Sequence, residues 1–130
     1  MSNFDRVYSG AYWENKVGYC RALQAGDFIA VTGTAPIDSH GFVYSTGDPL
    51  KQTLRCLEII EEALNKFDAG REDIIRTRLF VTDIGRWEEY GEAHRQFFLQ
   101  HRPTTTMVEV KRLIMPGMLV EIEADAYVGQ

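Results

Sequence analysis

Polar side chains stand within β-rich segments of this sequence, where apolar residues would be expected. Tyr19 and Arg21 lie two residues apart in one such segment, and Thr32 and Thr34 lie two apart at the end of the next. Side chains two apart on a strand leave the same face, so each pair is expected to share a surface. Each residue alone is a weak signal of a site, and their combination is a stronger one.

Carboxylates alternate along the last β-rich segment, at Glu121, Glu123 and Asp125. An apolar strand does not bury a carboxylate without a cationic or hydrogen-bonding partner. We therefore expect Glu123 and Asp125 to lie on an exposed strand face, and we assign Glu121, nearer the start of the strand, to a site. Glu14, before the first β-rich segment, either rims a pocket or caps the fold. His94 lies on an apolar helix face and is expected to be a packed, hydrogen-bonded core histidine.

The composition argues against several classes of partner. The chain has 130 residues, and its 19 acidic residues outnumber its 14 basic residues, which gives a net charge of −5. Phosphate binding relies on clustered Lys and Arg, so no nucleic-acid partner is expected. The two cysteines and three histidines lack metal-ligand spacing, and no metal site is predicted. No signal peptide or bilayer-spanning stretch is visible, so we expect no membrane and a cytoplasmic location.

Two segments show helical periodicity. In the first, Asp48 suits the N-cap and Pro49 the first turn, with Gly70 as the stop. Its apolar face consists of Leu50, Leu54, Leu57, Ile60, Leu64 and Phe67. In the second, Asp83 is the predicted N-cap. Its apolar face consists of Trp87, Tyr90, His94, Phe97 and Phe98. Both helices are one-sided, so each is expected to lie on a sheet.

The remaining β-rich segments predict a single α+β domain over residues 1–130. The expected strands are 17–23, 28–34, 75–82, 105–110 and 119–128, with short extra strands near 6–9 and 42–44. The first two are predicted to form one hairpin and the last two another, around Met115-Pro116-Gly117. The result is a mixed sheet with two helices packed on one face. Because the strands look apolar on both faces, we expect sister subunits to cover the open face; loops and the N-terminal arm are the alternative.

Three motifs resemble the Rid family (reactive intermediate deaminases, also called the YjgF family). They are Val31-Thr32-Gly33-Thr34-Ala35-Pro36, Arg78-Leu79-Phe80-Val81-Thr82-Asp83, and Pro103-Thr104-Thr105-Thr106-Met107-Val108-Glu109-Val110 with Val120-Glu121-Ile122-Glu123-Ala124. The resemblance implies a chorismate-mutase-like fold and a homotrimer with pockets at the subunit seams. It also implies hydrolysis of 2-imino acids or their enamine tautomers, with no metal or organic cofactor. Tyr19, Thr32 and Glu121 match catalytic positions, and Glu121 corresponds to the acid that positions water.

The sequence departs from the family pattern at two positions. Thr105 stands where active members carry the arginine that grips the substrate carboxylate, and Met107 stands where a cysteine is common. A threonine cannot make the bidentate contact of a guanidinium. The sequence is therefore identified as a member of an arginine-lacking subgroup, with Thr105, Met107 and Arg21 as candidate ligand-binding residues. Arg21 would either supply the missing positive charge or pair with Glu121 or Glu109.

Two functional hypotheses follow. The first is a hydrolase acting on a small imine, enamine or related carbonyl compound at the seam pocket, and for it 2-imino acids are doubtful substrates. The second is a non-catalytic binding or regulatory protein that uses the same pocket for a small ligand, a carboxylate being one candidate. An RNA-cleaving role ranks behind both, because the chain is acidic and lacks a catalytic His or Lys pair.

Overall fold

The computed structural model describes residues 4–129. Its strands are β1 (Asp5–Val7), β2 (Ala22–Ala25), β3 (Phe28–Thr34), β4 (Ile74–Val81), β5 (Thr104–Glu109) and β6 (Val120–Tyr127), and its helices are α1 (Tyr12–Val17), α2 (Pro49–Asn65) and α3 (Trp87–Phe98). Short 3-10 turns occupy Arg71–Asp73 and Ile84–Arg86. The two long helices and the strands β3, β4, β5 and β6 are the ones that the sequence predicts.

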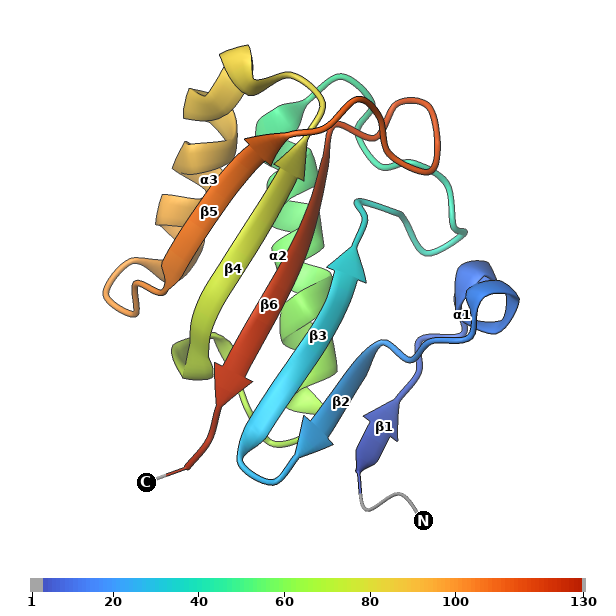
Figure 1. Cartoon of the computed structure of the whole chain (residues 1–130). Coiled ribbons are helices and arrows are strands. Elements are labelled where there is room, and N and C mark those ends of the chain that lie inside the picture. Colours follow the sequence, from blue (N-terminus) through green and yellow to red (C-terminus); the bar gives the residue numbers. More distant parts are fainter. Residues whose placement is uncertain (1–3, 130) are drawn as a thin grey trace.

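The six strands form one mixed sheet in the order β1-β2-β3-β6-β4-β5. Only β4 and β5 run parallel, and α3 connects them; the other neighbours are antiparallel. Figure 1 shows α2 and α3 side by side behind the sheet and α1 apart from them, at the side of the sheet where β1 and β2 lie. The predicted α+β class, with two helices on one face of a mixed sheet, is confirmed.

The start of α2 follows the predicted capping chemistry, but its end does not. The side chain of Asp48 accepts a hydrogen bond from the Lys51 amide at 2.9 Å, and Pro49 occupies the first turn. The helix ends at Asn65 rather than at Gly70. Asp68, with a φ of 58°, takes a left-handed conformation three residues after the helix ends.

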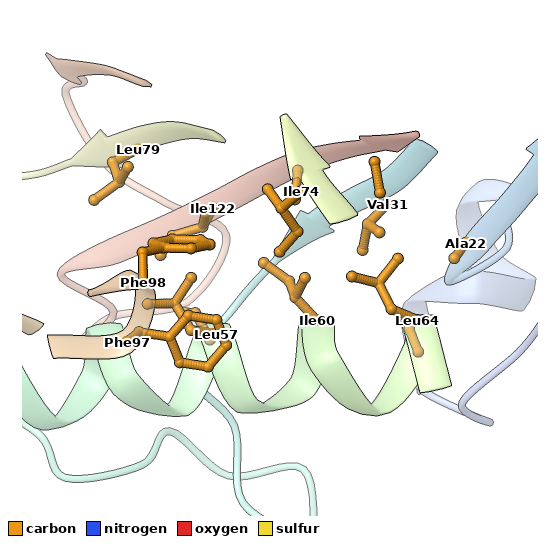
Figure 2. Packing of buried hydrophobic residues seen from close by; sticks show 14 of the residues in the cluster. Ala22, Val31, Leu57, Ile60, Leu64, Ile74, Leu79, Phe97, Phe98 and Ile122 are labelled. Atoms are coloured by element: carbon orange, nitrogen blue, oxygen red, sulfur yellow. The ribbon is translucent and has the colours of Figure 1, made fainter. Parts of the chain in front are cut away.

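The core lies between the sheet and the two long helices. Figure 2 shows side chains from β3, β4 and β6 pointing toward those of α2 and α3. Fully buried members include Ile29, Leu57, Ile60, Leu64 and Leu79. Each such side chain contributes roughly 1.5–3 kcal/mol of transfer free energy, so this layer dominates the stability of the fold.

The open face of the sheet is more polar than the sequence suggests. Ile29, Val31, Leu79 and Val81 contribute much of the apolar character of the strands, and all four lie in the core beneath the helices. The opposite face carries the ion pairs of Arg78 with Glu123 and Asp125 at 3.5 and 3.3 Å, and the exposed side chains of Phe28, Val108 and Tyr127. Burial of a uniformly apolar face is therefore not the reason for this chain to self-associate.

Two expected strand assignments are wrong at the N-terminal end. No strand spans 17–23, because Tyr12–Val17 is helical and Gly18 ends that helix with a φ of 88°. The strand begins only at Ala22. Near 42–44 the backbone forms one isolated bridge, between Ile37 and Val43. Gly18 adopts a left-handed conformation without steric cost, and this turn lets the chain reverse from α1 into β2.

The predicted C-terminal hairpin is also wrong. β5 pairs in parallel with β4 at the edge of the sheet, whereas β6 lies between β3 and β4 and pairs with both. The turn around Met115-Pro116-Gly117 therefore carries the chain past β4 instead of joining two neighbours. A run of two strands and a turn does not distinguish a hairpin from this crossing.

Candidate functional site

A cavity of about 740 Å³ lies where α1, the end of β3 and the start of β6 meet. Four of the six predicted site residues line it: Tyr19, Arg21, Thr32 and Glu121. Apolar side chains complete the wall, among them Trp13, Ile59, Phe80, Ile114 and Met118. The structure thus brings Tyr19 and Arg21 together with Thr32, as expected, although neither Tyr19 nor Arg21 belongs to a strand.

An irregularity in β3 shapes the floor of the cavity. The register of β3 on β6 shifts between Val31 and Thr34, and the Thr32 amide donates instead to the Arg21 carbonyl at 3.1 Å. Gly33 lies within this irregularity, directly against Glu121. A Cβ at Gly33 would stand 3.0 Å from Glu121 Oε2, so a glycine is needed for the carboxylate to occupy its position.

Glu121 is the acid that faces this cavity. It is half-buried, lies opposite Phe80 in the β4–β6 ladder, and forms no ion pair among residues 4–129 within 4 Å. Burial raises its pKa above the usual value, while the positive charge of Arg21 partly offsets this rise. A carboxyl group whose pKa is raised can both hold and release a proton closer to neutral pH, as acid–base catalysis requires.

Arg21 is held by Glu14, which α1 brings beneath it. Glu14 is buried; it accepts hydrogen bonds from the Ser9 amide and hydroxyl and lies 3.5 Å from Arg21 Nε. Arg21 Nη1 donates to Thr34 Oγ1 at 3.2 Å. The guanidinium therefore pairs with neither of the expected acids: Glu121 makes no ion pair with it, and Glu109 accepts from the Ile84 amide.

The other two predicted site residues lie elsewhere in the chain. Thr105 is exposed on the edge strand β5, where its hydroxyl accepts a hydrogen bond from Thr77 Oγ1 at 2.8 Å. Met107 packs against the core. Neither lines the cavity that contains Glu121. Within one chain the six predicted residues are therefore divided into a group of four and a group of two.

His94 is hydrogen-bonded to Thr77, which is in turn hydrogen-bonded to Thr105. Its Nε2 lies 2.8 Å from Thr77 Oγ1, and its ring packs on Phe98 with 4.6 Å between centroids. This is the packed, hydrogen-bonded histidine that the sequence predicts. Burial lowers its pKa from 6.5 to about 4, so the ring is neutral at pH 7.

A second cavity, of about 690 Å³, shares a wall with the first. Tyr19, Thr32 and Glu123 line both, and Cys20 lines only the second. Among residues 4–129, no three His, Cys, Asp or Glu side chains gather as metal ligands would, and none of the helices there has the length and apolarity to cross a bilayer. The two cavities are lined by carboxyl, hydroxyl and guanidinium groups and by the thiol of Cys20.

Two residues matter more than the sequence indicates. The sequence allows Glu14 to be either a pocket rim or a cap, whereas the structure makes it the buried partner of Arg21, in a position that depends on helix α1. Gly33 lies in the motif Val31-Thr32-Gly33-Thr34-Ala35-Pro36, and it closely approaches Glu121, which is far away in the sequence. An isolated glycine within a strand pattern does indicate a bulge or a close contact, and this general rule could have found it.

The chain is similar to proteins that share both this fold and its length. The sequence profile of the family described as Endoribonuclease L-PSP matches residues 13–128. An uncharacterised protein of Streptomyces coelicolor is 37% identical over 124 residues, which are 95% of this chain and 92% of that protein. A RutC family protein of Pyrococcus abyssi is 32% identical over 84% of this chain and 85% of its own length.

Solved structures show the same fold in members of the same family. A crystal structure of a YjgF/YER057c/UK114 family member from Mycobacterium tuberculosis is 47% identical and superposes with a TM-score of 0.87 over 97% of this chain and all of the other. The YjgF gene product of E. coli is 26% identical, with a TM-score of 0.77 over 84% of this chain and 87% of the other. The chain therefore belongs to the YjgF/Rid family, the family of the Endoribonuclease L-PSP profile.

Proposed function

We propose that the chain is a hydrolase of small imines or enamines that acts at the cavity containing Glu121. The observation that carries this proposal is a half-buried carboxyl group with a raised pKa, facing a cavity together with the hydroxyls of Tyr19 and Thr32. Imine hydrolysis needs a held substrate, an activated water and a proton transfer. Family membership supports a small-molecule role of this kind.

The proposed reaction is R₂C=NH + H₂O → R₂C=O + NH₃. As water adds to the imine carbon, Glu121 accepts a proton from the water and passes it to the imine nitrogen, which gives the carbinolamine R₂C(OH)NH₂. As the C–N bond breaks, Glu121 moves the proton of the new hydroxyl group to the nitrogen, so that ammonia leaves and the C=O bond forms. Tyr19 and Thr32 hold the substrate, and the oxygen that water adds to it, through hydrogen bonds. Arg21 tunes the carboxyl group, because its charge favours the ionised form of Glu121.

The working enzyme is proposed to be a homotrimer. Thr105 and Met107 lie outside the cavity of their own chain, and a position at a seam between subunits is what the resemblance to the Rid family implies for them. In a trimer the exposed Thr105 of one chain would complete the cavity of the next. Self-association is supported by family membership.

A non-catalytic binding protein is the second candidate. It is favoured by Thr105, because the family arginine that holds substrate is replaced by a residue without charge. RNA cleavage is not favoured, since four of the six charged residues that line the cavity are acidic.

Turnover distinguishes the two candidates. Imines are generated in solution by oxidation of primary amines and amino acids, and their decay is followed with and without the protein. If the proposal holds, the protein accelerates decay, and Glu121→Gln lowers the rate by at least about a hundredfold. Glu88→Gln, which changes an exposed acid on α3, is the matched control and leaves the rate unchanged. Ligand binding without acceleration of any imine would favour the binding protein.

A further inference from the structure

The charged groups around the cavity are mostly acidic. Its lining contains two arginines and four acids, namely Arg21, Arg55, Asp38, Glu62, Glu121 and Glu123. A cavity with an excess of negative charge attracts cations and repels anions, and this preference is strongest where the dielectric constant is low. The lining therefore favours a neutral or positively charged ligand.

Both arginines are already occupied by groups of the chain itself. Arg21 has a side chain only 9% exposed, lies 3.5 Å from Glu14 and donates to Thr34. Arg55 donates its Nε–H to the Ile37 carbonyl at 2.7 Å, and its Nη1 lies 3.4 Å from Glu58 and 3.8 Å from Glu62. Each guanidinium therefore already faces an acidic side chain of the chain itself, which offsets its attraction for a ligand carboxylate, while the buried Nε of Arg21 forms no hydrogen bond within residues 4–129.

The carboxylate of Glu121 would repel a ligand carboxylate. It is the acid among residues 4–129 that lies at the irregular end of β3, against Gly33 and without an ion-pair partner. A carboxylate placed over the cavity floor would meet this group. A protonated imine or an N–H donor would instead gain a charge-assisted hydrogen bond from it.

The remaining wall suits a hydrocarbon group. Trp13, Ile59, Phe80, Ile114 and Met118 supply aromatic and aliphatic surface around the polar floor. Burying an apolar substituent against such side chains is favourable by roughly 25 cal/mol for each Å² removed from water. The cavity thus combines one acidic floor with a broad apolar wall.

We propose that the cavity selects imines that carry a hydrocarbon substituent and no carboxylate, in the neutral or protonated form. This inference rests on the proposed function and names its substrate class. Such an imine arises when a primary amine loses two electrons and two protons from its H–C–N–H unit to an oxidase or dehydrogenase. Hydrolysis then yields a ketone or aldehyde and ammonia, so the class of reaction upstream is amine oxidation rather than amino-acid oxidation.

Three stable compounds with one carbon skeleton test the charge preference: 4-phenylbutan-2-one, 4-phenylbutan-2-amine and 2-oxo-4-phenylbutanoate. They are neutral, cationic and anionic at pH 7. Affinities are measured by calorimetric or ligand-observed NMR titration of the wild-type protein. We expect the ketone and the amine each to bind at least tenfold more tightly than the oxo acid. An oxo acid that binds as tightly as the ketone would overturn the inference, and so would the absence of binding by all three.

Two variants, with Glu88→Gln as a control, test which residues produce the charge preference of the cavity. Glu121→Gln should reduce the advantage of the amine over the ketone at least fivefold, whereas Glu88→Gln should leave all three affinities unchanged. Glu14→Gln removes the charge that occupies Arg21 and should strengthen oxo-acid binding. Equal amine affinity in the wild type and in Glu121→Gln would contradict the assignment of Glu121.

Hydrolysis is scored separately from binding. Ketone and amine binding with no turnover of the matching imine would sink the hydrolase proposal and leave the ligand class intact. Turnover of 2-imino acids in preference to carboxylate-free imines would confirm the hydrolase and overturn the ligand class.

Discussion

At the scale of single residues, the site depends on how closely Gly33 and Glu121 approach. Gly33→Ala would place a methyl carbon 3.0 Å from Glu121 Oε2, so the carboxylate must move by a few tenths of an ångström. The carboxyl end of a side chain yields easily, and we expect the free energy of unfolding to change by less than about 1 kcal/mol. Imine hydrolysis should fall at least tenfold, because a displaced acid no longer meets the water.

The matched control for this substitution lies on α3. Gly91 has no atom within 4 Å of an added Cβ, so Gly91→Ala should stabilise the fold by about 0.5–1 kcal/mol and leave activity unchanged. Chemical denaturation and the hydrolysis assay measure both effects. If Gly33→Ala retains full activity, Glu121 does not need its observed position.

His94 gives the fold a defined dependence on pH. Its pKa in the folded chain is lowered from 6.5 to about 4, so the unfolded chain binds the proton first as the solution is acidified. The contribution of His94 to stability is complete above pH 6.5, is lost as pH falls toward 4, and changes little below that value. The loss amounts to about 3 kcal/mol at most.

Comparison with His94→Gln isolates this effect. Glutamine retains a polar group toward Thr77 and does not titrate, so the difference in unfolding free energy between variant and wild type should drift by up to about 3 kcal/mol between pH 6.5 and 4. Denaturation titrations across that range provide the measurement. A constant difference would show that the His94 ring is solvated in the folded state.

At the scale of elements, α2 depends on its N-terminal cap. Asp48→Ala removes the hydrogen bond that the carboxylate accepts from the Lys51 amide, and we expect it to cost about 1 kcal/mol. Asp48→Asn keeps a side-chain oxygen in place and should cost little. Thermal or denaturant unfolding distinguishes the two, and an equal loss in both variants would show that charge at the helix terminus matters more than the hydrogen bond.

How much could be predicted from the sequence also varies by element. The 3.6-residue periodicity and the cap at Asp48 indicate α2. The β-branched run in β4 predicts a strand from local sequence alone. α1 was missed because its six residues carry no periodic apolar face and because Gly18 was placed within a strand. The position of β6 between β3 and β4 depends on pairing of distant segments, which no local pattern encodes.

The candidate site also combines features that local sequence predicts with features that depend on the fold. Tyr19 and Arg21 were expected to share a surface because of strand parity, and they do line one cavity, but α1 and a turn place them there rather than a strand. Thr105 and Met107 were placed with Glu121 by resemblance, and one chain holds them apart. The pairing of Arg21 with Glu14 depended on a helix that carries no sequence signal.

At the scale of the whole molecule, we expect three chains to assemble. Light scattering at micromolar concentration should give about three times the 14.9 kDa mass of one chain. Arg78→Glu would set a third acid beside Glu123 and Asp125 on the open face and should release monomers. Arg95→Glu, on the exposed side of α3, is the control and should leave the mass unchanged. A wild-type mass near that of one chain would contradict the seam-pocket arrangement.

The central position of β6 has a consequence for how the chain is made on the ribosome. β3 and β4 are synthesised before β6, yet in the finished sheet each pairs with β6 and not with the other. Until residues 120–127 leave the exit tunnel, the nascent chain holds two half-sheets with unpaired edges and a core lacking Val120, Ile122 and Ala124. The domain therefore completes its folding only after strand β6 is translated.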